Sequence, residues 1–307
     1  MTLQKLTGLR PQIYEHPSDK AALDALSHNA GLHMVVRQVN AWGMERLLRV
    51  RLTGSYLHVT KDNFPEIYQY LVTACETLDL PLMPDLYIAG GREINAFTAG
   101  VDRPLIVLNA GAIDELSSDE LLFVIAHEVG HIKSSHVLYS QIADMIPYVG
   151  DIVGAIPMIG ETIGALIRAG TEVALLRWKQ LSELTADRAG LLGCQNAETA
   201  YRTLMKLAGL PTKYFRAINT EDFIAQAREF EAMDSDKLTL VTKWFSAAGE
   251  THPWTVMRAQ QLWLWVESGG YEKVIVNPRP LLCTNCEFEL RGQERFCPKC
   301  SWPVCPP

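Results

Sequence analysis

Residues 117–136 decide the fold, and they read SSDELLFVIAHEVGHIKSSH. Ser117 and, three positions later, Glu120 form the pattern of a capping box, in which two side chains satisfy backbone N–H groups at a helix start. The apolar run that follows predicts a buried helix beginning at Ser117. His127 and His131 are four positions apart, so both imidazoles project from one face of that helix. One helix therefore presents two nitrogen ligands side by side.

This pair of histidines has the spacing of a zinc site. Two imidazoles one turn apart can bind a single Zn²⁺ without distorting the backbone. Glu128 directly follows the first ligand, so its carboxylate lies beside the metal, where it can accept a proton from the attacking water and pass it to a leaving amine. The pattern H-E-x-x-H occurs by chance in roughly one chain in a hundred of this length. A surface helix with two unrelated histidines is therefore the alternative interpretation.

A catalytic zinc also needs a third protein ligand and an open fourth position. We predict that Glu183 is this ligand, because it lies in a second helical pattern that runs from Glu172 to Leu192. Asp187 follows Glu183 by four positions and is expected to accept the outer N–H of a ligand histidine. Two helices that each carry two functional groups one turn apart can enclose a metal. This coincidence argues against chance histidines.

The segments before the histidine helix predict an α+β fold. Five short runs are strand-like: LLRVRL (47–52), YLHVT (56–60), DLYIAG (85–90), INAFTAG (94–100) and PLIVLNAG (104–111). Helical patterns fill most of the chain after residue 117. The fold should therefore be mostly helical, with a small mixed or antiparallel sheet.

Changes in pattern along the chain predict three regions. Residues 1–60 are expected to form an accessory region, and residues 61–275 a catalytic domain with a helical insert at 137–171. NPRPLL (277–282) has the composition of a linker. The remaining segment, 281–307, forms a small separate module in this interpretation.

That C-terminal module contains two C-x-x-C pairs separated by ten residues, formed by Cys283, Cys286, Cys297 and Cys300. Each pair aims two thiolates at one metal, and two such turns complete a tetrahedral site. The segment resembles a small zinc ribbon, in which the metal supplies the stability that so short a module cannot obtain from a core. A rubredoxin-type iron site would suit the same ligands. Cys305 is a spare thiol, and Cys75 and Cys194 are expected to be buried packing residues.

Four sequence blocks together resemble a known family: INAF (94–97), DELLFVIAHEVGHIKSSH (119–136), ELTAD (183–187) and HPWTVMR (252–258). They look like the gluzincin peptidases related to the CAAX prenyl endopeptidases and the bacterial HtpX-like proteases, over about residues 60–270. The resemblance implies a zincin-type metalloendopeptidase with zinc ligands His127, His131 and Glu183 and with Glu128 as general base.

The same resemblance implies roles for five further residues. The strand with Asn95, Ala96 and Phe97 would lie along the cleft and pair with extended substrate. His252 and Arg258 would contact substrate and the developing oxyanion. From the residues alone, Phe97 could equally be a core aromatic, and His252 a helix cap or a surface residue.

The position of His136 predicts no part in the metal site. It lies five positions past His131, which on a continuous helix is about 140° further round. We therefore expect its side chain to point away from the metal. His16, His28, His33 and His58 are also interpreted as structural, since none has a partner at ligand spacing.

Between the two halves of the site lies a tandem repeat, IPYVGDIVGA (146–155) followed by IPMIGETIGA (156–165). Acidic and basic residues interrupt every long apolar window from 137 to 171, so no membrane span is expected there. The repeat could form a helical hairpin near the cleft, an oligomer contact or a peripheral membrane attachment.

Composition narrows the class of protein further. A net charge of −7 and a pI near 5.7 give no general attraction to nucleic acid. The first residues lack the apolar core of a signal peptide, and clustered thiolate ligands favour a reducing compartment. We therefore predict a cytoplasmic zinc metalloendopeptidase that acts on polypeptides, with protein quality control as one suitable role. It would hold one catalytic and one structural zinc.

A second hypothesis is a non-catalytic, zinc-stabilised adaptor that binds polypeptides through the strand at Asn95. Glu128 argues against it, because a purely structural metal site gains nothing from a carboxylate beside the metal.

Overall fold

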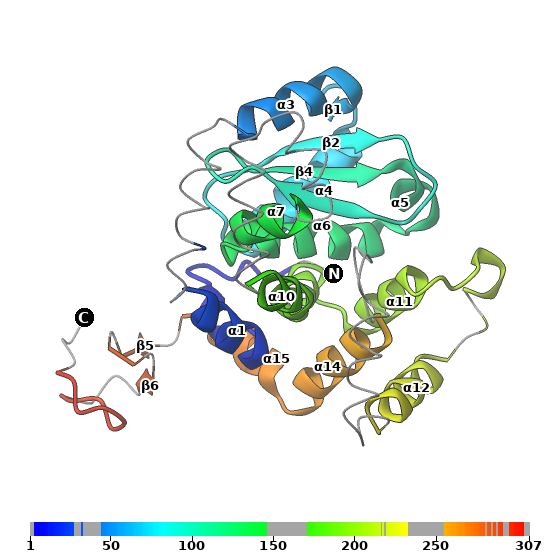
Figure 1. The fold of residues 1–307 in the computed structure, drawn as a ribbon. Coiled ribbons are helices and arrows are strands. Elements are labelled where there is room, and N and C mark those ends of the chain that lie inside the picture. The colour runs from blue at the N-terminus through cyan, green and yellow to red at the C-terminus, as the bar shows by residue number, and fades with distance from the viewer. Residues whose placement is uncertain are drawn as a thin grey trace.

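A four-stranded sheet lies over a set of packed helices in the part of the chain that the structure describes (Figure 1). The structure is a computed structural model, and it describes residues 3–27, 32, 44–145, 171–215, 217, 219–232, 255–279, 281–283, 285–286, 288–290 and 295–303. The tandem repeat at 146–165, His252 and Cys305 lie outside the described residues.

The sheet is mixed, as the sequence predicts. Its strands are β1 (Leu57–Val59), β2 (Asp85–Ala89), β3 (Ala96–Ala99) and β4 (Leu105–Asn109). Their order is β1-β2-β4-β3, with β2 and β4 parallel and the other two pairs antiparallel. The first four residues of β4 are buried, as expected for a strand with neighbours on both sides. β3 forms one edge of the sheet.

The prediction of a strand at 47–52 is wrong. These residues belong to a helix, α3 (Met44–Ser55), which lies on the upper face of the sheet (Figure 1). Leu52 of α3 packs with Tyr87 and Leu105 of the sheet, while Val50 is 66% exposed. An apolar run this short fits both the period of a strand and the period of a helix. The surface against which it packs then determines which of the two forms.

Helices make up most of the remaining described chain. They are α1 (Pro17–Ser27), α4 (Pro65–Thr77), α5 (Ala110–Glu115), α6 (Ser118–Lys133), α7 (Val137–Met145), α10 (Thr171–Cys194), α11 (Ala197–Leu207), α12 (Thr220–Ala232), α14 (Thr255–Glu267) and α15 (Gly270–Val276), with 3-10 turns η1 (Pro11–Ile13) and η3 (Thr212–Tyr214). None of the helices in the described ranges is long and apolar enough to cross a bilayer.

Helices α6 and α10 pack unusually closely because glycine faces alanine at two points of their contact. A Cβ placed on Gly130 would lie 2.4 Å from the Cβ of Ala189, and one on Gly193 would lie 2.2 Å from the Cβ of Ala126. Neither contact is sterically possible with a larger residue unless the helices move apart. The two helices that carry the motifs can therefore approach each other only with glycine at these positions.

The main core surrounds α6, whose residues from Glu120 to His131 are all buried. Leu6 and Tyr14, from the segment before α1, belong to the same apolar cluster as Phe123 of α6. Residues near the N-terminus thus contribute to the core of the catalytic domain. The division of the chain at residue 60 stays a prediction.

Candidate active site

The capping box at the start of α6 is present as predicted. The backbone N–H of Ser117 donates to Glu120 Oε2 at 2.8 Å. The same carboxylate forms a buried ion pair with Lys206 of α11, at 2.7 Å. The start of α6 is thus held by a local and a long-range contact.

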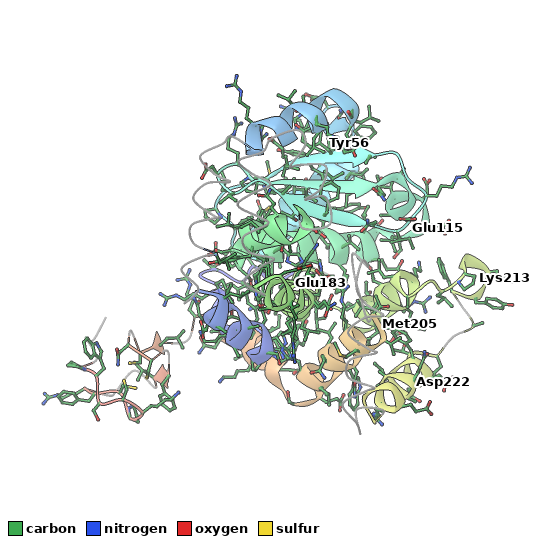
Figure 2. All side chains as sticks on the ribbon, in the orientation of Figure 1. Tyr56, Glu115, Glu183, Met205, Lys213 and Asp222 are labelled. Atoms are coloured by element: carbon green, nitrogen blue, oxygen red, sulfur yellow. The ribbon has the colours of Figure 1, made fainter. Side chains whose placement is uncertain are left out.

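Helix α10 brings Glu183 to the two histidines of α6 near the middle of the molecule (Figure 2). The Nε2 atoms of His127 and His131 lie 3.2 Å apart. Glu183 Oε2 lies 3.5 Å from His127 Nε2, and Glu183 Oε1 lies 3.4 Å from His131 Nε2. All three side chains are buried. Each of them therefore turns a ligand atom toward one common point.

The spacing of these donor atoms, two imidazole nitrogens and the two oxygens of Glu183, fits zinc. Ligand atoms at about 2.0–2.1 Å from a tetrahedral Zn²⁺ lie about 3.3 Å from one another. The observed separations of 3.2, 3.4 and 3.5 Å are close to that edge length. Two imidazoles and one carboxylate are also a donor set found in catalytic zinc sites, which keep a fourth position open.

Asp187 occupies the position predicted for it, behind His127. Its Oδ1 lies 3.1 Å from His127 Nδ1, on the side of the ring away from Glu183. Burial opposes protonation of His127, but hydrogen bonds and charge from Asp187 and Glu183 outweigh it and raise its pKa to about 9. Burial dominates at His131 and lowers its pKa. A cation bound here would replace the proton that the carboxylates now favour on His127.

Arg258 of α14 is almost fully enclosed, with 1% of its surface exposed. Its Nε and Nη2 donate to the two oxygens of Asp187, at 2.8 and 2.6 Å, and its Nη1 lies 3.1 Å from Glu183 Oε2. Burial alone would raise the pKa of Asp187, but Arg258 and, after it, His127 outweigh burial and lower that pKa. The single positive charge of the guanidinium is thus shared between the carboxylates of Asp187 and Glu183.

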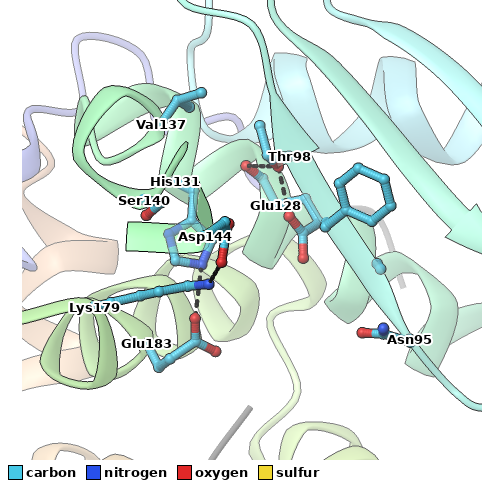
Figure 3. A pocket seen from close by; sticks show the side chains of 11 residues that line it. Asn95, Thr98, Glu128, His131, Val137, Ser140, Asp144, Lys179 and Glu183 are labelled. Atoms are coloured by element: carbon cyan, nitrogen blue, oxygen red, sulfur yellow. Dashed lines mark hydrogen bonds and ion pairs between the residues drawn. The ribbon is translucent and has the colours of Figure 1, made fainter. Parts of the chain in front are cut away.

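Glu128 faces the cleft from α6 with its carboxylate held by the sheet. Thr98 of β3 donates a hydrogen bond from Oγ1 to Glu128 Oε2, at 2.5 Å (Figure 3). This contact could not be predicted from the sequence, because no motif marks a threonine of an edge strand as the partner of a catalytic carboxylate. The hydroxyl orients the carboxylate that the sequence predicts to be the general base.

A cleft of about 250 Å³ opens above Glu128, His131 and Glu183 (Figure 3). One side is formed by β3 and the residue before it, and the other by α7 and α10. The lining residues from these walls are Asn95, Ala96, Phe97, Thr98, Val137, Ser140, Asp144 and Lys179. Phe97 is 38% exposed, so it is a cleft residue and not the core aromatic of the alternative interpretation. The predicted substrate strand therefore borders the predicted metal site.

His136 is not among the residues that could hold the metal, as expected, but it contacts a predicted ligand, which the helical extrapolation did not predict. Helix α6 ends at Lys133, and Ser135 adopts a left-handed conformation with φ of 60°. The chain therefore reverses before His136, which does not continue the rotation of the helix. Its Nδ1 lies 3.1 Å from His131 Nδ1. The sequence signal for this reversal, Ser-Ser after a basic helix end, is weak.

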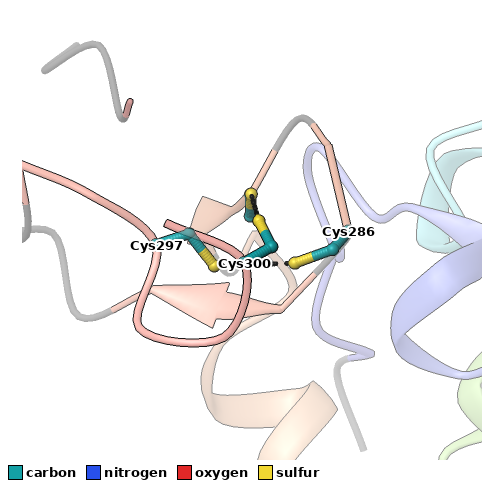
Figure 4. Close-up of side chains that lie close together, drawn as sticks. Cys286, Cys297 and Cys300 are labelled. Atoms are coloured by element: carbon teal, nitrogen blue, oxygen red, sulfur yellow. Dashed lines mark hydrogen bonds between the residues drawn. The ribbon is translucent and has the colours of Figure 1, made fainter. Parts of the chain in front are cut away.

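The four predicted thiolates also come together. The Sγ atoms of Cys283 and Cys300 lie 3.6 Å apart, and those of Cys286 and Cys297 lie 3.5 Å apart (Figure 4). Thiolates at about 2.3 Å from tetrahedral zinc lie about 3.8 Å from one another. Two short antiparallel strands, β5 (Leu281–Leu282) and β6 (Glu289–Leu290), lie beside the cluster. This arrangement is compatible with a zinc ribbon.

The families and relatives that this sequence resembles are metallopeptidases, in agreement with the geometry of the site. The sequence profile of peptidase family M48 matches residues 61–266, more than half of the chain. The chain belongs to peptidase family M48. As a member of that family it is a zinc-dependent metallopeptidase that acts on polypeptides. The predicted family resemblance and the predicted fold class are confirmed.

The share of each relative's length that aligns with this chain differs from one relative to another. The plastoglobule-localized metallopeptidase 48, chloroplastic, of Arabidopsis thaliana is 30% identical over 264 residues, which are 85% of this chain and 74% of the relative. A protease HtpX homolog of Gemmatimonas aurantiaca is 32% identical over 126 residues, 40% of this chain and 43% of the relative. The crystal structure of Ste24p of S. mikatae gives a TM-score of 0.34 at 16% identity, over 75% of this chain and 65% of that one.

Proposed function

We propose that this M48 peptidase is an endopeptidase whose catalytic zinc is held by His127, His131 and Glu183 and whose general base is Glu128. The supporting observation is the triangle of three buried ligand residues, whose nearest donor atoms lie 3.2–3.5 Å apart, with His131 and Glu183 lining a cleft. Asp187 holds His127 in the orientation that turns its Nε2 toward this triangle.

Zinc held by His127, His131 and Glu183 would supply a Lewis acid that polarises the scissile carbonyl and lowers the pKa of the attacking water. Glu128 accepts a proton from that water and later donates it to the leaving amine. Thr98 holds the carboxylate of Glu128 at the cleft through its hydrogen bond. Because Glu128 is only 2% exposed, bulk water competes little for the proton during the transfer.

Substrate is proposed to bind as an extended strand along β3. This strand is an edge of the sheet, and a polypeptide added beside it would pass over Glu128. Asn95, Ala96 and Phe97 would contact the substrate from this side. On the opposite side, Asp144 of α7 and Lys179 of α10 form an ion pair at the cleft wall (Figure 3).

Two residues are proposed to act on the developing oxyanion. His252 would contact it directly, a role that rests on the sequence resemblance alone. Arg258 also lines a small cavity of about 20 Å³ beside Asn95 and Glu128. From there its positive charge would favour negative charge that develops at the scissile carbonyl.

The cysteine module is proposed to hold a second, structural zinc, because four thiolates leave no open coordination position. Its thiolates need a reducing environment, which supports our proposal of a cytoplasmic location. The repeat at 146–165 joins α7 to α10, two elements that line the cleft. A contact of this repeat with a membrane surface or a protein stays a prediction from the sequence.

The test is hydrolysis of an unfolded polypeptide such as casein by the Glu128→Gln variant. We expect the rate to fall by about 10²- to 10⁴-fold, because proton transfer is lost, while metal analysis finds the zinc content of the wild type. Glu229→Gln, an exposed change on α12, is the matched control and should hydrolyse casein normally. A folded Glu128→Gln protein that hydrolyses casein at the wild-type rate would falsify the assignment.

A further inference from the structure

A second buried chain of polar side chains leads away from the metal site, through His131 and not through His127. It begins at His131, whose Nδ1 lies 3.1 Å from His136 Nδ1. On the far side of the His136 ring, Nε2 lies 3.1 Å from Asp19 Oδ2, at ion-pair distance although its N–H is not fully aligned with the oxygen. His136 and Asp19 are both completely buried. Solvent therefore takes no part in this chain of contacts.

Only one arrangement of protons satisfies this chain when His131 binds a metal. Its Nε2 faces His127 and Glu183, so Nε2 is the ligand atom and Nδ1 carries the hydrogen. His136 Nδ1 must then accept that hydrogen, which places the hydrogen of His136 on Nε2, facing Asp19. The tautomer of each ring is thus fixed by the next group along the chain, and the carboxylate of Asp19 fixes the last one.

Asp19 is itself held firmly by the helix that carries Glu183. Trp178 Nε1 donates to Asp19 Oδ1 at 2.9 Å, and Thr185 Oγ1 donates to Asp19 Oδ2 at 2.5 Å. Both donors lie on α10. The ring of His136 also packs edge-on against Trp178, with 5.6 Å between ring centroids. Asp19 therefore connects α10 to His136, and through His136 to a ligand on α6.

We propose that Asp19 and His136 are positioning residues that orient His131 toward the catalytic metal. The proposal rests on the proposed function, in which His131 is a zinc ligand. His127 is oriented by the buried carboxylate of Asp187, which Arg258 holds in place. In the same way, His131 would be oriented through His136 by the buried carboxylate of Asp19, which donors on α10 hold in place. Asp19 lies in α1, before residues 61–266 that match the family. The N-terminal segment would thus complete the metal site, beyond its contribution to the core.

The buried Asp19–His136 pair could contribute to the stability of the fold alone. A second buried ion pair in the chain provides a control for this alternative. Glu120 and Lys206 form an ion pair at the other end of α6, with side chains 5% and 7% exposed. Loss of either pair should lower the free energy of unfolding. Only loss of the Asp19–His136 pair should change how the folded protein binds a metal.

The experiment titrates metal-free, full-length protein with Co²⁺ and records its absorption. Thiolate ligands give sulfur-to-cobalt charge-transfer bands that nitrogen and oxygen ligands lack, so the cysteine cluster and the histidine site can be followed separately in one chain. The variants are His136→Phe, which keeps an aromatic ring without nitrogens, and Asp19→Asn, which keeps the shape of the carboxylate. Glu120→Gln is the control for a buried charge.

For His136→Phe and Asp19→Asn we expect metal affinity at the histidine site to fall by about 10- to 100-fold, with a changed ligand-field spectrum at saturation. His136→Asn should recover part of the affinity, because its side-chain oxygen can accept the hydrogen of His131. Glu120→Gln should lower stability without changing either the affinity or the spectrum.

The outcomes separate the two proposals. If His131→Ala does not weaken the histidine site, the proposed metal site itself is wrong. If His131→Ala weakens it while folded His136→Phe and Asp19→Asn bind cobalt as the wild type does, the positioning role is overturned. The wild type gives a check that needs no variant, since proton NMR of the cobalt protein should show a slowly exchanging, shifted N–H for each ligand imidazole. Rapid exchange of the His131 N–H would also refute the proposal.

Discussion

Replacement of Gly130 by alanine should separate α6 and α10, the two helices that carry the proposed zinc ligands. The new methyl group would lie 2.4 Å from the Cβ of Ala189, about 1 Å short of the nearest ordinary contact of 3.4 Å. Such overpacking costs about 1–3 kcal/mol, and the better helix propensity of alanine offsets about 1 kcal/mol of it. We expect the variant to be destabilised by up to about 2 kcal/mol. Glu183 would move away from His127, so zinc affinity should fall as well.

The compensating change is Ala189→Gly, which removes the methyl group on the other side of the same contact. Alone it should cost about 1 kcal/mol in helix propensity. Combined with Gly130→Ala it should restore stability and zinc affinity nearly to the wild type, with a coupling of about 1–3 kcal/mol between the two positions. Denaturant unfolding gives the stabilities, and competition with a chelator gives the zinc affinities. Wild-type stability and zinc affinity in the single Gly130→Ala protein would refute the reasoning, as would a double variant no better than Gly130→Ala.

Three further results are expected. Glu183→Ala should lose the catalytic metal together with hydrolysis of casein, and full zinc occupancy after dialysis would remove Glu183 from the ligand set. Thr98→Val should lower kcat by roughly tenfold with KM and zinc content unchanged, because Glu128 loses a hydrogen bond worth about 1.5–3 kcal/mol; an unchanged kcat would contradict the orienting role of the hydroxyl. Serine at both Cys297 and Cys300 should reduce the zinc content from about two ions per chain to about one while hydrolysis continues, and two ions retained would show that the cysteine site is wrong.

Much of the site could be predicted from the sequence because its key spacings are local. The start of α6 depends on Ser117 and Glu120, which lie within one turn of each other. The pairing of His127 with His131, and of Glu183 with Asp187, follows from the period of a helix once the helices are predicted. A C-x-x-C pair likewise brings its two thiolates together without help from the rest of the chain. In each case the chemistry is contained in one short segment.

The contacts that orient these groups could not be predicted, because they join segments far apart in the chain. Thr185 and Asp19 are 166 positions apart, and Arg258 and Asp187 are 71 apart. Nothing local identifies Thr98 as the partner of Glu128. The helical extrapolation did not predict the contact of His136 with His131, because a single left-handed residue, Ser135, reverses the chain between them.

The sequence by itself thus determined which residues we predict to bind the metal and move the proton, since one turn of helix is enough to place them on a common face. Only the tertiary structure decided how closely the two helices approach and which buried groups hold the ligands in place. Those properties depend on steric fit at Gly130 and on hydrogen bonds formed across the core, and both exist only once distant segments have packed together.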